Sequence, residues 1–389
     1  MKVVIYTGKI PSSTFIRRLE SGLAKRNIQI ILHGYKSRNV EKTNNIKVLG
    51  FKTKISKIKL SILYFFKLIN RYEDLIKILS IVSLEKGLNN KFNKWVKYAP
   101  IVFEKPDVFH LQWVSNIDYW LALQRFDIKV ICSLRGRLIN SLPLYDHGLS
   151  NMYKELLPHV DGFHAVSKAI AKNTVALGAE SRKIKVVYSG LNLDELDYNK
   201  PSKWPSNKEP IKILSIGHPG WKKAYHYSIL AMKNLKNNNV NFHYEIVGGM
   251  SEELFYLRSD LSLIDNITFT QNLTFVDVQK KIADTDLFLL PSIEEGIANV
   301  VLESMALGTP VLASDCGGMN EVISNDKNGW LYHRYNIEEM ARKIEHIKNK
   351  NLQQIQNTTF EARQTIINQH SVDQLAINME SLYKSVLNE

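Results

Sequence analysis

The sequence predicts an α/β protein made of two doubly wound domains. The chain has 389 residues, which is too long for a typical single core. In both halves, apolar segments of strand length alternate with helical stretches. A polar, proline-interrupted stretch at residues 197–210 (DYNKPSKWPSNKEP) separates the halves and is the expected linker. Ligands of such sheets bind beyond the carboxyl ends of the strands, so we expect a site in a cleft where the domains face each other.

The expected domains are residues 1–196, the linker 197–210, residues 211–370, and a C-terminal helix in 371–389 that packs back toward the first domain. The first domain should begin with a strand, then a loop from Thr7 to Ser13 and a helix from about Thr14. Its expected strands are Lys2–Tyr6, Ile28–Leu32, Val108–Leu111, Val130–Ser133, Gly162–Val166 and Lys185–Tyr188. Those of the second domain are Lys212–Ile216, Asn241–Val247, Ile267–Phe269, Leu287–Leu290 and Val311–Ala313.

Cysteine usage and hydropathy indicate the compartment. The two cysteines, Cys132 and Cys316, provide neither a disulfide framework nor a metal cluster. The N-terminal MKVVIYTGKIP reads as a strand rather than a signal peptide, and no window approaches the ~18 apolar residues of a transmembrane helix. These features predict a cytoplasmic protein.

The net charge of +13 is concentrated in one segment. Residues 36–100 contain 15 Lys and Arg against four Asp and Glu, a local balance of +11. Within this segment, residues 55–69 repeat isoleucine and phenylalanine at helical spacing, with lysines among and before them. One interpretation is a basic amphipathic helix at an anionic membrane surface, peripheral to the cytoplasmic face; nucleic acid is not an expected partner. The other is a core-packed helix with a solvated basic face.

The segment SIEEGIANVVLESMALGTPVLASDCGG places Glu295 and Glu303 eight residues apart. On one helix they would be separated by ~12 Å. A retaining glycosidase pair needs its carboxyl groups ~5–5.5 Å apart, so this chemistry is excluded. Asn299 is the expected N-cap of a helix from Val300 to Leu307, and its N-terminus favours an anion such as a diphosphate. Two carboxylates flanking a phosphate site fit a nucleotide sugar.

This segment resembles the Glu-x₇-Glu signature of retaining GT-B-fold glycosyltransferases of family 4, the glycosyl transferases group 1. The neighbouring LFLLPSIEEG, MALGTPVLASDCGGMNEVI and NGWL extend the match over residues 283–331. The resemblance implies that Glu295 contacts the donor sugar and Glu303 the ribose. It also implies that loop amides hold sugar hydroxyls and phosphate, at Gly296, Ile297, Ala298, Asn299 and Val300.

SIGHPGWKKAYHYSILAM resembles the donor loop of the same family, Gly-Arg-Leu-x₃-Lys-Gly. Lys223 falls on the phosphate-binding lysine, where a cation would neutralise a leaving diphosphate without a metal. The family arginine is His218 here, and its final glycine is Ala224. A histidine still donates a hydrogen bond but is only partly charged near neutral pH.

The N-terminal half resembles the family at three places. PSSTFIRRLESGLAKRN is similar to an opening motif of bacterial surface-polysaccharide members, and Gly8 before it would allow close approach of a diphosphate or is a plain turn glycine. CSLRGRLI places Arg135 where many members have a histidine. Because arginine stays protonated, Arg135 would bind phosphate or carboxylate rather than act as a base. The third place, DGFHAVSKAIAKNTVALGAESRKIKVVYSGLNL, matches the segment that leads out of the first domain.

Other patterns are weaker. Asp284-Thr285-Asp286 has the D-x-D form of metal-dependent transferases, but such a motif should end a strand, and this one begins the strand Leu287–Leu290. Four histidines show no ligand-like spacing and are interpreted as structural or surface residues: His110, His147, His159 and His164. Hydrolase, NTPase and dinucleotide-binding motifs are lacking.

The resulting hypothesis is a retaining, metal-independent hexosyltransferase without cofactor. It would move a sugar from a UDP- or GDP-sugar to a glycan or lipid-linked acceptor in bacterial polysaccharide biosynthesis. Glu295, Lys223 and Arg135 are the expected catalytic residues. Two alternatives stay open: a non-catalytic nucleotide-sugar-binding protein, and a nucleotide-sugar epimerase of the same fold.

Overall fold

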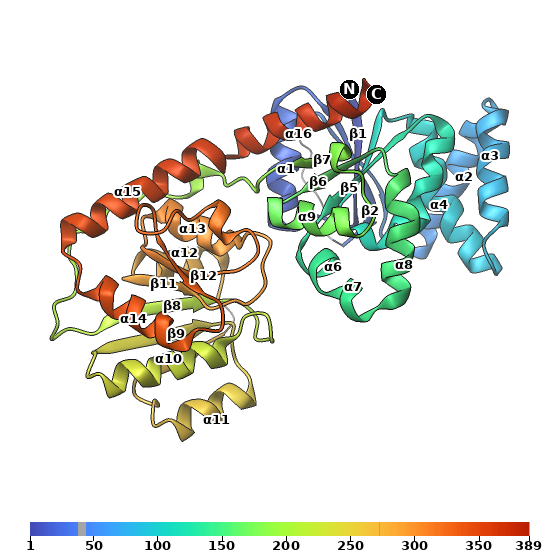
Figure 1. The fold of residues 1–389 in the computed structure, drawn as a ribbon. Coiled ribbons are helices and arrows are strands. Elements are labelled where there is room, and N and C mark those ends of the chain that lie inside the picture. The colour runs from blue at the N-terminus through green and yellow to red at the C-terminus, as the bar shows by residue number, and fades with distance from the viewer. Residues whose placement is uncertain (38–43, 272, 389) are drawn as a thin grey trace. The chain divides into compact units, whose positions relative to one another are not determined.

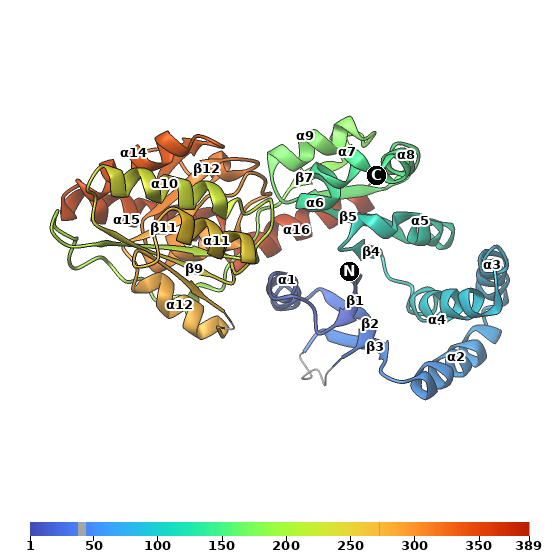
Figure 2. The ribbon, with the colours of Figure 1, turned by 90° about the horizontal axis from the view of Figure 1, so that it is seen from below.

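The computed structural model describes residues 1–37, 44–271 and 273–388, and it contains two compact units. The first unit comprises residues 1–166, 170–188 and 372–389, and the second comprises residues 167–169 and 189–371. Each unit is a parallel sheet flanked by helices (Figure 1; Figure 2). The predicted class, α/β with two doubly wound sheets, is confirmed.

Among the described residues, the first unit has the strands β1 (Lys2–Ile10), β2 (Gln29–Lys36), β3 (Ile46–Phe51), β4 (Val108–Leu111), β5 (Lys129–Leu134), β6 (Gly162–Ala165) and β7 (Ile184–Val186). Its helices are α1 (Thr14–Lys25), α2 (Lys54–Ile69), α3 (Tyr72–Ser83), α4 (Leu88–Glu104), α5 (Ile117–Trp120), α6 (Gly136–Asn140), α7 (Leu142–Tyr145), α8 (His147–Leu156), α9 (Lys168–Ala176) and α16 (Val372–Leu387).

The described part of the second unit has the strands β8 (Ile211–Ile216), β9 (Phe242–Val247), β10 (Ile267–Thr270), β11 (Leu287–Leu290), β12 (Val311–Asp315) and β13 (Trp330–His333). Its helices are α10 (Tyr225–Asn237), α11 (Glu252–Asp260), α12 (Phe275–Ala283), α13 (Asn299–Leu307), α14 (Ile337–Lys348) and α15 (Leu352–Gln369).

The strand order reverses near the middle of each sheet. The first sheet has the order β3-β2-β1-β4-β5-β6-β7, and the second has the order β10-β9-β8-β11-β12-β13, with parallel pairing throughout. Helices cover both faces, so the central strands are apolar without alternation: VFHL in β4 and LFLL in β11 are fully buried. The reversals, between β1 and β4 and between β8 and β11, are where ligands bind in doubly wound sheets.

The edge strands β3 and β13 were not predicted from the sequence. Each lies at one margin of its sheet, and β3 in particular is only partly buried. The other two edge strands, β7 and β10, were predicted, so edge position alone does not explain these misses. In β3 (IKVLGF), Lys47 and Gly50 interrupt the apolar run, which weakens its signal in the sequence.

The expected boundary between the first strand and the loop after it was wrong. The first strand does not end at Tyr6: it continues to Ile10 through an irregularity between Tyr6 and Gly8, so Gly8 lies within β1 rather than in a loop. Gly8 has a φ of +80° and pairs with Gly34 of β2, where an added Cβ would lie 2.9 Å from the Gly8 carbonyl carbon. Glycine is therefore required at both positions of this pair, Gly8 of β1 and Gly34 of β2.

The expected linker is attached to the second unit. Residues 197–210 contain no helix or strand, and the Trp204 indole donates to the Lys348 carbonyl of α14 at 3.0 Å. The amide of Asn199 donates to the Leu307 carbonyl at the end of α13 at 2.9 Å. Hydrogen bonds to two helices hold this segment in place.

The C-terminal helix α16 belongs to the first unit. Val372, Ala376 and Met379 join α1 and the strands β1 and β2 in one apolar cluster. Gly22 of α1 makes the close approach possible, because an added Cβ there would lie 2.9 Å from Val372 Cγ1 and 3.1 Å from the Val372 carbonyl oxygen. No helix in the described residues is long and apolar enough to cross a membrane.

We predict that Gly22→Ala lowers the free energy of unfolding by about 1–3 kcal/mol, because the methyl group overpacks the contact between α1 and α16. In an exposed helix the same change would stabilise by about 1 kcal/mol. Urea denaturation checks this, with Ser21→Ala at the exposed neighbouring position as the control. A Gly22→Ala protein as stable as wild type would show that α16 does not pack this closely.

Candidate functional site

In the second unit, the loops after β8 and β11 meet because their strands are neighbours at the strand-order reversal. The loop after β8 contains His218 and Lys223, and the loop after β11 contains Glu295. The Ile293 amide donates to the Lys222 carbonyl at 2.8 Å, which joins the two loops. The topology therefore brings together residues that are more than seventy positions apart.

Lys223 and Glu295 form an ion pair. Lys223 Nζ lies 2.7 Å from Glu295 Oε1, and the Ser292 hydroxyl donates to the same oxygen at 3.1 Å. Both side chains are about one-fifth exposed, so they are reachable from solvent. The neighbouring Lys222 and Glu294 form a second ion pair. A ligand that brings a negative charge to Lys223 and hydrogen-bond donors to Glu295 can take over both halves of this pair without leaving either charge unpaired.

A third loop, after β12, supports the Glu295 backbone. Gly317 has a φ of +55°, and an added Cβ would lie 1.7 Å from the Glu295 carbonyl oxygen. The Gly318 amide donates to the Gly296 carbonyl at 2.8 Å. The two glycines of the DCGG sequence are thus the residues that let the loops touch.

The start of α13 presents free backbone amides. The helix begins at Asn299, and the N-cap is Ala298, which makes no side-chain capping bond; the prediction that Asn299 is the N-cap was wrong. Within the described chain, the amides of residues 296–300 have no hydrogen-bond partner, whereas those of Val301 and Leu302 reach the Ala298 carbonyl. The Asn299 Oδ1 atom is buried and also without a partner. Uncapped amides at a helix N-terminus favour an anion or hydroxyl oxygens.

Glu303 is the fifth residue of α13 and is 9% exposed, whereas Glu295 precedes the helix. The estimated separation of ~12 Å assumed that one helix carries both, and this assumption does not hold. His218 is exposed in the loop after β8. Ala224 ends that loop with a φ of +52°, a left-handed conformation in which a glycine would be unstrained. This left-handed conformation explains why the donor-loop pattern of the family has a glycine at the position of Ala224.

In the first unit, Arg135 lies at the corresponding edge of the sheet. It follows β5 and donates from Nη2 to Gln112 Oε1 at 3.0 Å, and its guanidinium lies 4.5 Å from the centre of the Phe15 ring. Burial lowers the pKa of Arg135 to about 10, so it stays charged near neutral pH. Arg135 Nε and Gln112 Nε2 are buried and have no partner among the described residues. The site is therefore cationic, rigid and incompletely paired.

A buried polar chain runs across β4, β5 and β6. His110 Nε2 lies 2.8 Å from Ser133 Oγ, which lies 2.9 Å from His164 Nδ1. At its ends, His110 Nδ1 contacts the Tyr383 hydroxyl of α16 at 2.7 Å, and His164 Nε2 contacts the Val187 carbonyl at 2.9 Å. The sequence predicted structural or surface roles for both histidines, but not that they meet. The available signal was a histidine at the third position of two buried strands, VFHL and GFHA.

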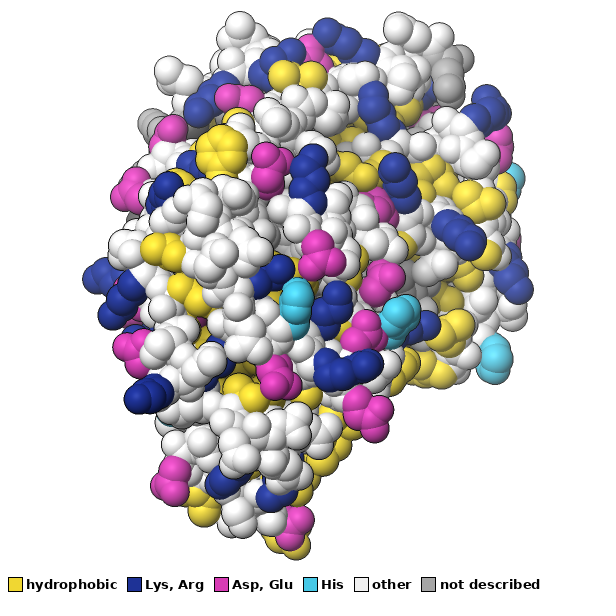
Figure 3. Space-filling view, turned by 60° about the vertical axis from the view of Figure 1, so that its left-hand side comes forward, with side chains coloured by type: hydrophobic (Ala, Val, Ile, Leu, Met, Phe, Trp, Pro, Cys, Tyr) yellow, Lys and Arg dark blue, Asp and Glu magenta, His cyan; other side chains and the backbone are white. Residues whose placement is uncertain are grey.

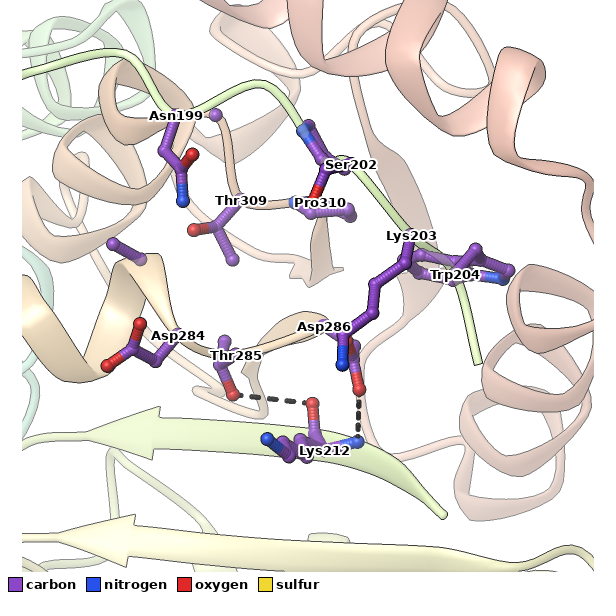
Figure 4. Close-up of a pocket in the computed structure, with 13 residues that line it drawn as sticks. Asn199, Ser202, Lys203, Trp204, Lys212, Asp284, Thr285, Asp286, Thr309 and Pro310 are labelled. Carbon is purple, nitrogen blue, oxygen red and sulfur yellow. Dashed lines mark hydrogen bonds between the residues drawn. The ribbon is translucent and has the colours of Figure 1, made fainter. Parts of the chain in front are cut away.

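Figure 4 shows a pocket of about 390 Å³ at the other edge of the second sheet. It lies at the amino ends of β8, β11 and β12, and Asp284, Thr285 and Asp286 line it. Asp286 Oδ2 accepts from the Lys212 amide at 2.8 Å, and the Thr285 hydroxyl donates to the Lys212 carbonyl at 3.3 Å. The D-x-D residues thus anchor β8 on the edge opposite to Lys223 and Glu295. No three His, Cys, Asp or Glu side chains of the described chain form a group that could hold a metal ion.

Both units match known families. Residues 198–370 match the model of the Glycosyl transferases group 1, and residues 12–195 match that of Glycosyltransferase Family 4. The chain is 26% identical over 260 residues to a protein of Escherichia coli (strain K12) that is named as a colanic acid biosynthesis glycosyltransferase, WcaL. The match covers 65% of this chain and 63% of WcaL, so the chain spans less than two thirds of that relative.

Solved structures are similar over the whole chain. A glycosyltransferase from Rickettsia africae has a TM-score of 0.71 at 18% identity, covering 100% of this chain and 99% of its own. Anabaena HepE in complex with UDP-glucose has a TM-score of 0.70 at 15% identity, covering 99% and 100%. These likenesses show the GT-B fold.

The buried histidines predict a pH dependence of stability. Burial and the Arg135 charge lower the pKa of His164 to about 3, below its ordinary value of 6.5. The unfolded chain therefore binds a proton that the folded one does not, and stability is lost as the pH falls below about 6.5. Between pH 6 and pH 5 this histidine should contribute a loss of about 1.4 kcal/mol per pH unit. Urea unfolding at several pH values measures it.

His164→Asn should lower the free energy of unfolding at pH 7 but flatten its decline toward pH 5. The control is His147→Asn at an exposed position, which should leave the pH slope unchanged. If the free energies of unfolding of His164→Asn and wild type decline in parallel toward pH 5, His164 has the same pKa in the folded and unfolded chain. The lowered pKa of the folded state is then wrong.

Proposed function

Because the chain belongs to the glycosyl transferases group 1, we propose that it transfers a sugar from a nucleotide diphosphate donor to a glycan or lipid-linked acceptor. The observation that carries this proposal is the Lys223–Glu295 pair beside the free amides of residues 296–300. WcaL is named for polysaccharide biosynthesis, and we propose the same kind of pathway for this chain. The reaction would take place at the cytoplasmic face of a membrane.

In this proposal the donor exchanges partners with the resting ion pair. Lys223 leaves Glu295 for the diphosphate, and Glu295 turns to the sugar hydroxyls. The amides of residues 296–300 bind phosphate and hydroxyl oxygens, where the N-terminal end of α13 adds a favourable dipole. Glu303 binds the ribose hydroxyls, and His218 supplies one further hydrogen bond. Each charge in the site keeps an opposite charge or a hydrogen-bond donor throughout.

We propose transfer with retention of configuration on one face of the sugar. The acceptor oxygen forms a bond to the anomeric carbon as the bond from that carbon to the diphosphate oxygen breaks, and the leaving oxygen takes the acceptor proton. Lys223 and the loop amides meet the negative charge that develops on the diphosphate. Catalysis would then consist of positioning and charge stabilisation, and no enzyme carboxylate attacks the sugar.

Arg135 would bind an anion rather than move a proton. Its guanidinium is fixed by Gln112 and Phe15, and its Nε atom is unpaired. A planar fork held in this way fits a phosphate or a carboxylate. We assign it to an anionic group of the acceptor or donor.

A binding protein without activity is the second candidate. It is favoured by His218 and Arg135, which stand where the family pattern has other residues. Such a protein would bind the nucleotide sugar but release no nucleotide diphosphate on addition of acceptor. An epimerase of the same fold is disfavoured by the Glu-x₇-Glu spacing.

Donor binding is tested by thermal stabilisation with a panel of nucleotide sugars, beginning with UDP-glucose because HepE was solved with it. A donor at 100 times its Kd should add ~2.7 kcal/mol of stability. Lys223→Ala and Glu303→Ala should each weaken donor binding by about 1.5–3 kcal/mol, since a charge-assisted hydrogen bond is lost. Lys236→Ala, at an exposed position of α10, is the control. Full donor affinity in both site variants would refute the assignment.

The second test concerns metal. Since Lys223 and the amides would meet the charge of the diphosphate, we predict that the initial transfer rate changes less than twofold in excess EDTA. Mg²⁺ and Mn²⁺ are added back as controls. Transfer that strictly requires Mg²⁺ or Mn²⁺, and that is lost when Asp284 or Asp286 is replaced by Ala, would instead assign function to the D-x-D motif.

A further inference from the structure

Helix α2 has two opposite apolar faces, and only one of them is covered. Tyr64 and Leu68 are buried in the core of the first unit. The opposite face is exposed, from 43% at Phe65 to 68% at Ile55. Its members lie within roughly 100° of arc on the helix: Ile55, Ile58, Ile62, Phe65, Phe66 and Ile69. The alternative interpretation, that this stripe is core, is therefore wrong.

Further large apolar side chains are exposed on α3 and after it. On α3, Tyr72, Ile76 and Leu79 recur at i, i+4 and i+7 and are 48–66% exposed. Leu84 and Leu88, between α3 and α4, are 79% and 86% exposed. Both helices pack against α4 at the outer margin of the first unit (Figure 1; Figure 2). We call these residues and the stripe on α2 the α2–α3 surface. Large apolar side chains exposed in such number on two helices that contact each other indicate an interaction site.

The charge on α2 is of one sign, whereas α3 begins with Glu73 and Asp74, of which Asp74 is paired with Lys105. Helix α2 contains four lysines and no acidic residue, and Lys52 precedes it. Figure 3 shows a face of the molecule where basic and acidic side chains are interspersed, which is the usual arrangement on a soluble surface. Lys52, Lys54 and Lys59 are exposed and have no ion-pair partner among the described residues. They are free to bind an anionic surface.

The lysines of α2 are not equivalent, as the structure shows. Lys57 donates to Asn93 and lies 5.3 Å from the centre of the Phe51 ring, and burial lowers its pKa. Lys67 lies 4.9 Å from the centre of the Phe103 ring. These two side chains help to attach α2 to the unit, so a test of surface charge must leave them in place.

We propose that the α2–α3 surface inserts into the interface of an anionic lipid bilayer. Large apolar side chains flanked by unpaired lysines suit this occupant, since the apolar groups enter the acyl boundary while the lysines meet the head groups. A second copy of the chain would bring the same lysines together, and nucleic acid would leave the isoleucines and phenylalanines exposed. This inference rests on the proposed function only in expecting a lipid-linked acceptor.

Vesicle co-sedimentation tests the proposal with the full chain. We expect binding to phosphatidylcholine vesicles with about 30% phosphatidylglycerol, and much weaker binding to phosphatidylcholine alone. Salt at 1 M should weaken the binding, because the Debye length falls from ~8 Å at physiological strength to ~3 Å. Absence of binding to the anionic vesicles overturns the proposal.

Two variants separate the contributions of charge and apolar groups. Replacing Lys52, Lys54 and Lys59 by Gln should weaken binding to anionic vesicles about fivefold per lysine, on the order of 100-fold in total. The matched control replaces the exposed Lys200, Lys208 and Lys280 of the second unit by Gln, with the same loss of charge. Equal binding by the two lysine variants contradicts the proposal.

The apolar variant replaces Ile55, Ile62 and Phe66 by Ser, which should abolish vesicle binding with the lysines intact. Light scattering without lipid detects a dimer; if wild type is dimeric and this variant monomeric, the surface is an interface between copies and the membrane proposal fails. Donor-induced thermal stabilisation is measured on the same proteins without lipid. It should persist in all variants, so a failure of membrane docking is distinguished from a failure of the donor site.

Discussion

The reversal of strand order in each parallel sheet is the constraint on which both candidate sites depend. The strands β1 and β4, and likewise β8 and β11, are neighbours at a reversal, so the loops that follow each pair start side by side at the carboxyl edge of the sheet. In the second unit this places Lys223 beside Glu295. In the first unit Gln112 follows β4, at the reversal, and contacts Arg135, which follows the neighbouring strand β5. The same construction thus yields a site with balanced charges in one sheet and a cationic site in the other.

In the second unit, the polar groups of the candidate site can exchange their present partners for those of a ligand. The Lys223–Glu295 pair is partly exposed, and the amides at the start of α13 are unbonded within the described residues. A ligand with phosphate and hydroxyl groups can satisfy all of these at once, without unpairing a buried charge. The backbone around them is fixed by close contacts such as that of Gly317 with the Glu295 carbonyl. Rigid backbone and exchangeable side chains together suit positional catalysis.

The first unit combines a buried polar interior with an apolar exterior. The chain through His110, Ser133 and His164 is fully internal, and burial keeps both imidazoles neutral at ordinary pH by lowering their pKa. These histidines therefore connect β4, β5, β6 and α16 rather than exchange protons with solvent. The α2–α3 surface has the reverse character, since apolar groups face outward. Exposure of apolar side chains costs free energy in water. A partner that removes these side chains from water, as proposed above, explains why they face outward.

The sequence by itself determined the alternation of strands and helices, the two-sheet class and the Glu295–Glu303 segment, because strand, loop and helix start all lie within a short consecutive stretch. It did not predict β3 or β13, two of the four edge strands; in β3 the apolar run is interrupted by Lys47 and Gly50. It assigned the cap of α13 to Asn299, because cap preference is statistical and the backbone conformation decides the cap. Only the tertiary structure showed that His110 and His164 share one hydrogen-bonded chain, and that Lys57 is structural while Lys59 is free. Likewise, helical periodicity identified the residues of α2 that share a face, but which face the core covers is decided by the elements packed against it.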